Sequence, residues 1–376
     1  MNAVRNMKWA LWLLLIGLLS LIVACGQAAP AAPPPAEEAV AEEAASPAEE
    51  PEPAMEMESI TFQAGYLPQG NISFIPAYVA QEKGFFKEQG LNVAIEHTPP
   101  GTGGQFQQLA AKNIEFITSP SDTHLKGIDQ SDTPFVAVIT LGHAADHALM
   151  VLDNGEIENL ADIKGKLVGY KFQPDPWLLS MLTAVNLSLD DVELVPVGFD
   201  PRVLLPESGE GKVDALQVFK SNEPDILNRE GHPVKVFYPE DFGVHFLGQN
   251  ILTHRDFITE RPEMVQRFVK AFLKGLEYSV DPANTEEVVD IIIQYAGKDA
   301  DRDHNRFIYQ TEIEPSYITG PGTSEVGLGY ATDEEWQDMV GIMLEFGGIE
   351  KELPLEQVVD MQFVEAAYEN GKLIWP

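Results

Sequence analysis

The chain has 376 residues and a formal net charge of −35, from 59 acidic and 24 basic side chains. This charge repels nucleic-acid phosphates and anionic lipid headgroups, which excludes both as partners of the folded surface. Hydrophobic residues make up 44% and charged residues 22% of the chain, an ordinary globular balance, and the length predicts two or three domains. A single cysteine, Cys25, excludes an internal disulfide.

The first 24 residues have the layout of a secretory signal peptide. Arg5 and Lys8 precede an apolar run that ends at Ala24. The run covers about 16 residues, fewer than the roughly 20 that span a bilayer. Segment 22–26 (IVACG) resembles a bacterial lipobox, in which diacylglycerol joins the cysteine thiol and the amine freed by cleavage is acylated, for example with palmitate. This predicts a lipid anchor on Cys25 at the extracytoplasmic side of the cell membrane; an uncleaved membrane anchor is the alternative.

Residues 25–58 are predicted to be a disordered tether behind that cysteine. Residues 26–58 contain nine glutamates, no lysine or arginine and no aromatic residue. Such a segment cannot bury enough apolar surface to offset the entropy of ordering. Proline stiffens the segment and like charges extend it, so it would hold the folded part off the membrane.

From residue 59, predicted strands and helices alternate, which indicates an α/β fold with parallel sheet. The predicted strands are 60–66, 91–96, 114–119, 135–141, 167–170, 192–197, 213–219, 234–238 and 249–253. The predicted helices are 76–88, 105–112, 122–129, 176–185, 203–209, 225–230, 263–280, 285–295, 333–346 and 358–368.

The strand at 249–253 is predicted to return to the first block, which divides the chain into two lobes. Lobe 1 would hold 59–145 and 250–376, with the C-terminal helices packed on it, and lobe 2 would hold 146–249. Ligands of open α/β sheets bind beyond the carboxyl ends of the strands, so a ligand cleft and hinge closure are expected between the lobes.

Four stretches, in this order, resemble type 2 periplasmic solute-binding proteins over about 60–370. They are GYLPQGNISFIPAYVAQEKGFFKEQGLNVAIE (65–96), ENLADIKGKLVGY (158–170), GKVDALQVFKSNEPDILNREG (211–231) and GVHFLGQNILTHRDFITERPEMVQRFVKAFLKGLEY (243–278). NEP (222–224) and FGVHFLGQNILT (242–253) are similar to the branch that binds thiamine-pyrimidine precursors. That branch also contains riboflavin-binding lipoproteins of ABC importers and a soluble pyrimidine-synthesising enzyme.

The resemblance implies a monomeric binding protein without catalysis or cofactor, which delivers a small molecule to an ABC permease in the membrane. The first loop, GYLPQGNIS (65–73), lacks the Trp, the Pro-Asn pair and the following His expected of thiamine-precursor binders. A larger planar heterocycle, riboflavin, is therefore the preferred ligand, with a thiamine-pyrimidine precursor as the alternative. An alternative of another class is a pyrimidine-forming or metal-dependent enzyme, and a third is a pure interaction module such as a surface adhesin.

A planar heterocycle needs aromatic faces and a few polar groups at its rim. Aromatic candidates stand at predicted strand ends or in the loops that follow, with core packing as the alternative role: Tyr66, Phe74, Phe172, Trp177 and Phe219. Polar candidates could accept or donate hydrogen bonds, with capping or surface exposure as the alternative: Asn71, Ser119, Asp122, Asn222, Glu223 and Asn250.

The sequence gives weaker support for a metal site, a nucleotide-binding loop or a catalytic nucleophile. His143 and His147 have the i, i+4 spacing of half a zinc site, but the segment is not predicted to be helical and no third ligand is evident. Neither a Walker A motif nor a Gly-x-Ser-x-Gly elbow occurs, and the only cysteine is assigned to the lipid. No metal site is therefore predicted.

Overall fold

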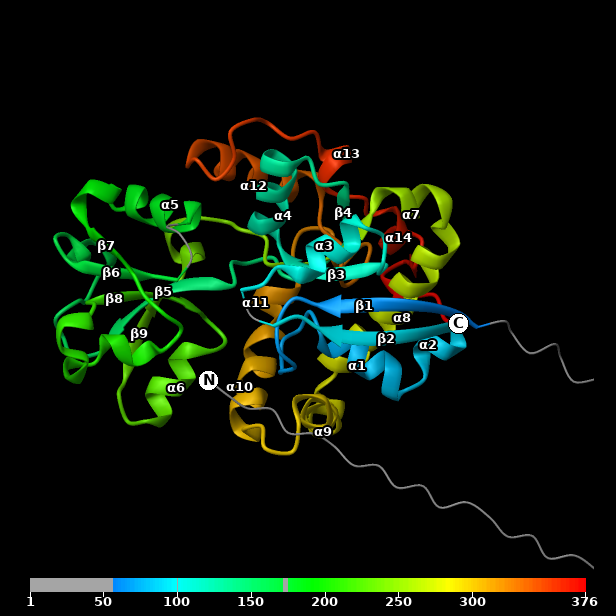
Figure 1. The fold of residues 1–376 in the computed structure, drawn as a ribbon, viewed down its shortest axis with the longest axis horizontal. Helices are drawn as coiled ribbons and strands as arrows, with labels where there is room; N and C mark the ends of the chain where they lie inside the picture. The colour runs from blue at the N-terminus through cyan, green and yellow to red at the C-terminus, as the bar shows by residue number, and fades with distance from the viewer. Residues whose placement is uncertain (1–56, 100, 172–174) are drawn as a thin grey trace, which may run out of the picture. The chain divides into compact units, whose positions relative to one another are not determined.

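Two five-stranded sheets carry the fold (Figure 1). The computed structural model describes residues 57–99, 101–171 and 175–376, which belong to one unit spanning 54–376. The predicted signal peptide, Cys25, nearly all of the predicted tether and Phe172 lie outside the described residues. Within the described part of the chain, no helix is long and apolar enough to cross a membrane.

The first sheet has the strand order β2-β1-β3-β10-β4. Its strands are β1 (Glu58–Ala64), β2 (Leu91–His97), β3 (Phe116–Pro120), β4 (Phe135–Thr140) and β10 (Gln249–His254). β1 runs parallel to β2 and β3, whereas β10 is antiparallel to both β3 and β4. The chain therefore leaves this sheet after β4 and returns to it with β10, as the sequence predicted, and the returning strand lies between β3 and β4.

The second sheet has the order β7-β6-β8-β5-β9. Its strands are β5 (His147–Leu152), β6 (Leu167–Tyr170), β7 (Glu193–Pro196), β8 (Ala215–Phe219) and β9 (Val234–Phe237). β5 was not predicted as a strand, yet it lies between β8 and β9 and pairs antiparallel with both. Its residues 148–151 are fully buried, so this strand lacks the alternation of polar and apolar residues that marks a half-buried strand.

Helices cover both sheets. They are α1 (Ile75–Glu82), α2 (Phe85–Glu88), α3 (Gly104–Ala110), α4 (Ser121–Ser131), α5 (Pro176–Ala184), α6 (Glu223–Arg229), α7 (Arg255–Glu260), α8 (Pro262–Val280) and α9 (Thr285–Ala296). The predicted helix 76–88 is wrong as one element, because Gly84 adopts φ +81° and separates α1 from α2. The predicted helix 203–209 is also wrong: two 3-10 turns, Pro201–Leu204 and Pro206–Gly211, replace it.

The C-terminal part is the least predictable region. Its helices are α10 (Arg302–Glu312), α11 (Pro315–Ile318), α12 (Asp333–Glu345), α13 (Leu355–Val358) and α14 (Gln362–Glu365). The predicted helix 358–368 is wrong, since only Val358, at the end of α13, and α14 are helical there, and β11 (Tyr368–Glu369) pairs with β12 (Lys372–Leu373) after them. α10 was not predicted, and α12 lies against α5 of the second lobe.

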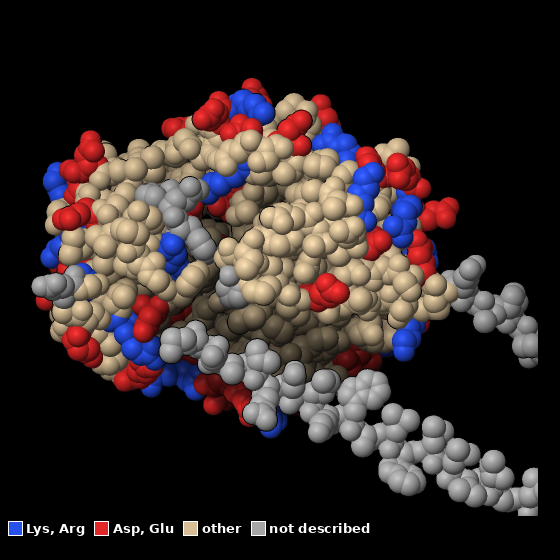
Figure 2. All heavy atoms as spheres, viewed as in Figure 1, with Lys and Arg blue, Asp and Glu red and all other residues tan. Residues whose placement is uncertain are grey.

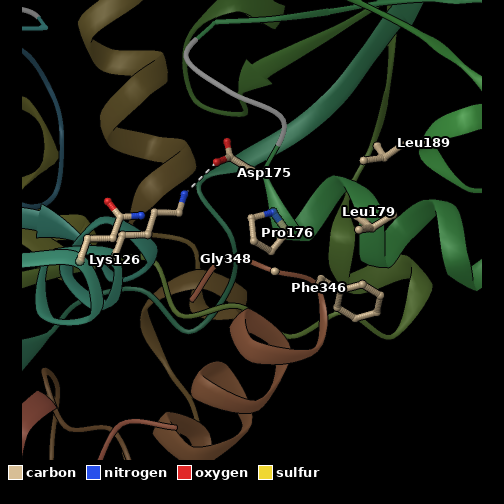
Figure 3. Close-up of a pocket in the computed structure, with 9 residues that line it drawn as sticks. Lys126, Asp175, Pro176, Leu179, Leu189, Phe346 and Gly348 are labelled. Carbon is tan, nitrogen blue, oxygen red and sulfur yellow. Dashed lines mark hydrogen bonds and ion pairs between the residues drawn. The ribbon is translucent and has the colours of Figure 1, made fainter. Parts of the chain in front are cut away.

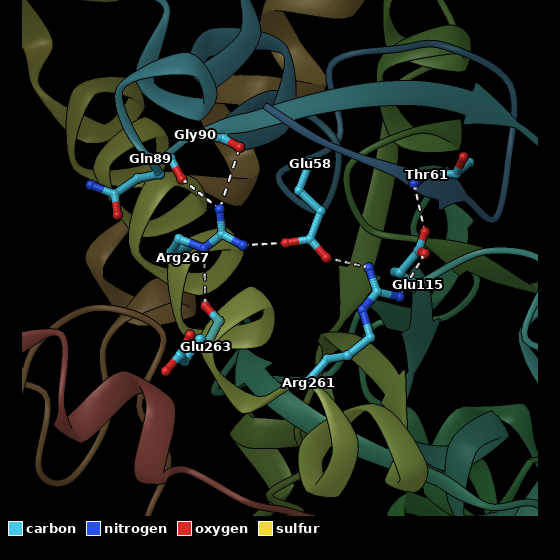
Figure 4. A network of polar contacts seen from close by, with 8 residues as sticks. All are labelled: Glu58, Thr61, Gln89, Gly90, Glu115, Arg261, Glu263 and Arg267. Carbon is cyan, nitrogen blue, oxygen red and sulfur yellow. Dashed lines mark hydrogen bonds and ion pairs between the residues drawn. The ribbon is translucent and has the colours of Figure 1, made fainter. Parts of the chain in front are cut away.

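An ion-pair network holds the start of β1 against α8 (Figure 4). Glu58 accepts hydrogen bonds from Arg261, at 2.7 Å, and from Arg267. Arg261 also donates to Glu115 at 3.1 Å, and Glu115 accepts the Thr61 N–H at 2.8 Å. Arg267 in addition donates to two backbone carbonyls between α2 and β2. Glu58 is the first residue of β1, so the strand begins two residues earlier than predicted.

Candidate functional site

Side chains of both lobes converge in one group, which we call the interlobe cluster. It consists of Tyr66, Asp122, Lys126, His147, Lys171, Asp175, Trp177, Gln217, Phe219 and Glu223. The first three come from the first lobe, after β1 and on α4, and the others come from strands, loops and the first residues of helices α5 and α6 in the second lobe. Figure 2 shows this face of the molecule hollowed between two tan surfaces, with charged side chains at the edge of the hollow.

Aromatic rings form the inner part of the interlobe cluster. The His147 imidazole, at the start of β5, makes ring contacts with both Trp177 and Phe219. Its centroid is 5.9 Å from that of Trp177, with the ring planes only 10° apart, and 4.5 Å from that of Phe219. Phe219 faces His147 because the two residues are paired across β8 and β5. His147 is thus stacked on Trp177 of α5 and tilted by 39° relative to Phe219, and it shares a strand end with Phe219.

A lysine joins the two lobes at the edge of the cluster (Figure 3). Lys126 of α4 donates to Asp122, one turn earlier, at 2.9 Å and to Asp175 of the second lobe at 3.0 Å. Asp175 also accepts the Gln217 amide at 2.5 Å. Burial raises the pKa of Asp122, but the charges of Lys126 and His147 more than offset this, so the pKa lies below its ordinary value. Both Asp122 and Lys126 are therefore ionised near neutral pH.

A second ion pair lies deeper in the second lobe. The Lys171 ammonium contacts the Glu223 carboxylate, and the Lys171 and Glu223 side chains are 4% and 3% exposed. Burial lowers the pKa of Lys171, and Glu223 partly opposes that shift. Glu223 also accepts the Phe219 N–H at 2.9 Å, and the ammonium lies 4.8 Å from the centre of the Phe219 ring. In the first lobe, burial and the charge of Glu223 raise the pKa of Tyr66.

A small hollow opens beside the lysine bridge. Its volume is about 130 Å³, and it is lined by Lys126, Gln130, Asp175, Pro176, Leu179, Leu189, Phe346, Gly347 and Gly348 (Figure 3). Ligand pockets for drug-sized molecules measure about 300–1,000 Å³. The hollow is therefore the outer edge of the interface between α4, α5 and the turn after α12, and too small to be the whole of a ligand site.

A tyrosine is wedged between the two chain crossovers that join the lobes. The Tyr317 hydroxyl, from α11, donates to Asp146, the residue before β5. A Cβ on either Gly142 or Gly248 would lie within 2.6 Å of that side chain. The two crossovers also bond to each other, from the Gly248 N–H to the Gly142 carbonyl at 2.8 Å. Only glycine at both positions lets the ring reach the hinge.

A buried carboxyl group lies next to this hinge. Glu312, the last residue of α10, accepts the Ser221 hydroxyl of the second lobe at 2.6 Å and the Ile72 N–H of the first lobe at 2.7 Å. It also accepts the Asn71 amide at 3.0 Å. Burial and the nearby Asp146 raise the pKa of Glu312 to about 8, although the Ser221 and Ile72 hydrogen bonds lower it in part.

Five of the predicted ligand residues lie in the interlobe cluster: Tyr66, Asp122, Trp177, Phe219 and Glu223. The other described candidates make structural contacts elsewhere. Asn71 holds Glu312, and Phe74 packs edge-on against His97. The Asn222 side chain bonds to His304 of α10 at 2.8 Å.

The two remaining candidates belong to the first sheet. Ser119 is buried and bonds to a neighbouring backbone carbonyl, and Asn250 donates to Ser121 at 2.6 Å. Both are buried where β3 and β10 pair, and the Asn250 Oδ1 has no hydrogen-bond partner among the described residues.

Sequence reasoning missed half of the interlobe cluster. His147 was considered only as a metal ligand, and Lys126, Lys171, Asp175 and Gln217 were not singled out. The i, i+4 spacing of Asp122 and Lys126 on a predicted helix could have indicated one ion pair. His143 and His147 do not act together, since His143 bonds to Glu335 at 2.7 Å. The described ranges contain no group of three His, Cys, Asp or Glu side chains placed to hold a metal ion.

The chain is similar to several characterised proteins. The riboflavin-binding protein RibY of Chloroflexus aurantiacus is 27% identical over 366 residues, which cover 95% of this chain and 98% of that protein. The formylaminopyrimidine-binding protein of Halalkalibacterium halodurans is 28% identical over 241 residues, 63% and 70% of the two chains. A Saccharomyces cerevisiae 4-amino-5-hydroxymethyl-2-methylpyrimidine phosphate synthase is 26% identical over 265 residues, 63% and 72% of the two chains.

Solved structures confirm the predicted two-lobed fold. The periplasmic sulfonate-binding protein SsuA of a putative sulfonate ABC transporter from Methylobacillus flagellatus KT superposes with a TM-score of 0.61 at 19% identity, over 83% of this chain and 94% of that one. The NMT1/THI5-like family matches residues 71–285, which include most of both sheets. The predicted resemblance is confirmed, and the chain belongs to the NMT1/THI5-like family.

Proposed function

We propose that this chain is the substrate-binding component of an ABC importer, and that it binds a planar heterocyclic vitamin, preferably riboflavin, and delivers it to a permease. The observation that carries the proposal is the group of aromatic rings formed by His147, Trp177 and Phe219, with ion-paired carboxylates at its rim. Among the described residues, the buried Trp177 Nε1 donor and Gln217 Oε1 acceptor lack hydrogen-bond partners. A ring that carries both an acceptor and a donor would satisfy them.

The relatives support a binding function, but they are named for different ligands and one is named as an enzyme. The relative that spans nearly all of both chains is named for riboflavin binding, and another is named for formylaminopyrimidine binding. A thiamine-pyrimidine precursor is therefore the alternative ligand in the same transport role. The yeast relative named as a synthase favours a pyrimidine-forming enzyme as the candidate of another class. We propose binding without catalysis, by a monomer.

Titration with riboflavin tests the ligand. The purified protein is expected to release heat and to quench flavin fluorescence as the ring stacks on the aromatic side chains. Phe219→Ala should weaken binding by about tenfold, since one lost stacking surface is worth roughly 1.4 kcal/mol. Trp375→Ala is the matched control, because that ring packs on Phe85, outside the interlobe cluster, and its loss should leave riboflavin affinity unchanged. If neither riboflavin nor a thiamine pyrimidine gives heat or quenching, both ligand proposals fail.

The proposed location is the outer face of the cell membrane, with Cys25 as the lipidated residue and the acidic segment 26–58 as a spacer. In cells that make the full chain, the parent protein should sediment with membranes and carry acyl mass on its N-terminal peptide. Cys25→Ser should shift the protein to the soluble fraction, because several acyl chains are needed for stable anchoring. A Cys25→Ser variant that still sediments with membranes in the same amount would contradict the anchor.

A further inference from the structure

Resting on the proposed function, we infer that the interlobe cluster selects an uncharged or cationic heterocycle and rejects ligands that carry a phosphate, sulfonate or carboxylate group. Selection in the interlobe cluster would then depend on the charge of the ligand as well as on the shape of its ring. It separates this chain from structural neighbours that are named for sulfonate binding, although the fold is shared.

The lysines at the site are already paired with carboxylates. Lys126 contacts two carboxylates at 2.9 and 3.0 Å, and Lys171 forms an almost fully buried ion pair with Glu223. The neighbouring Lys220, next to the hinge, lies 3.6 Å from Glu240 and 4.6 Å from the centre of the Tyr317 ring. An incoming anion would therefore have to displace a carboxylate of the protein before it could use any of these ammonium groups.

Carboxylates outnumber the lysines in the cluster. Asp122, Asp175 and Glu223 face two ammonium groups, those of Lys126 and Lys171. Neither ammonium group is therefore left without a carboxylate partner, and a ligand anion placed beside these carboxylates would meet like charges in a largely buried site.

The helix end that could attract an anion carries an acid of its own. Asp122 lies in the first turn of α4, which has no side-chain cap, and free N–H groups at such an end favour negative charge. The Asp122 side chain is 14% exposed and stays next to the interlobe lysine. The protein thus supplies the negative charge that a phosphate or sulfonate would otherwise bring.

Paired titrations test the inference with the full chain. Riboflavin is compared with riboflavin 5′-phosphate, and 4-amino-5-hydroxymethyl-2-methylpyrimidine with its phosphate ester; inorganic phosphate and ethanesulfonate are titrated alone. Each phosphate ester is expected to bind at least about tenfold more weakly than its parent alcohol, and the two simple anions should give no heat. A phosphate ester that binds as tightly as its alcohol, or measurable binding of either simple anion, overturns the inference.

Glu223→Gln provides the complementary test. It leaves the Lys171 ammonium without its carboxylate, so the ratio of phosphate-ester to alcohol affinity should rise at least about tenfold. Glu193→Gln makes the same change on the exposed edge strand β7 and should leave that ratio unchanged. If Glu223→Gln does not fold, Asp175→Asn releases one contact of Lys126 and is expected to raise the ratio in the same direction. An unchanged ratio in the folded variant counts against the inference.

The failure of the proposed function can be told apart from the failure of this inference. If neither riboflavin nor the pyrimidine alcohol binds, the proposed ligands are wrong. The two simple anions are read independently of the heterocycles: no binding of either still supports the exclusion of anions, and binding of either refutes it.

Discussion

Urea unfolding from pH 5 to pH 9 is expected to show a stability that falls as the pH rises, and Glu312→Gln should remove a large part of that fall. The pKa of Glu312 is raised from 4.5 to about 8 by burial and by Asp146. Between these values the folded protein holds a proton that the unfolded chain releases. The stabilisation is complete below pH 4.5 and is lost as the pH rises through 8, with a slope of about 1.4 kcal/mol per pH unit.

The comparison of variants isolates this one group. Glu312→Gln stays neutral at every pH, so the stability of the parent relative to the variant should decline through the same window. Glu314→Gln makes the same change two residues later on an exposed side chain, and its profile should follow the parent. Parallel profiles for the parent and Glu312→Gln would show that this carboxyl group is ionised in the folded protein at neutral pH.

Two glycine-to-alanine changes in helices are expected to have opposite effects. Gly275 of α8 lies against α1, where an added Cβ would come within 2.1 Å of the Pro76 carbonyl oxygen. One of the two helix backbones must move, so Gly275→Ala should reduce the free energy of unfolding by about 3 kcal/mol. Gly341 of α12 is exposed, and an added Cβ there would have no neighbouring atom within 4 Å, so Gly341→Ala should add about 0.5–1 kcal/mol through helix propensity.

The measurement is the urea midpoint together with the slope of the transition. A midpoint that falls for Gly275→Ala and rises for Gly341→Ala, at an unchanged slope, means that stability alone has changed. A Gly275→Ala protein as stable as the parent would mean that α1 and α8 approach less closely than described.

The sequence predicted elements best where one periodicity dominated. In the predicted helix 263–280, the seven apolar positions at helical spacing are all buried in α8. The strand β5 was not predicted, because its central residues are all buried and show no alternation of polar and apolar residues. The helix α10 was not predicted, because most of its residues are polar. Its buried residues are only Asn305, Ile308, Tyr309 and Glu312. Its role depends on contacts with the second lobe, which no local pattern encodes.

Half of the residues of the interlobe cluster could be predicted from the sequence. Aromatic residues and acids at strand ends, such as Phe219 and Glu223, are visible once strands are placed. Their partners are not, because Lys171 and Glu223 are 52 residues apart and meet only through the parallel pairing of β6 and β8. His147 was read with its sequence neighbour His143, whereas the fold places it against Trp177 and Phe219.

The position of β10 between β3 and β4 also sets an order of events during synthesis of the chain. β4 has only β10 as a neighbour in its sheet, so it has no strand partner until residue 254 has been made. The second sheet is complete by then, because its five strands end at Phe237. A ribosome-bound chain therefore carries a whole second sheet while β4 still lacks its neighbour, and premature release after residue 240 would leave the apolar edge of β3 and β4 unpaired.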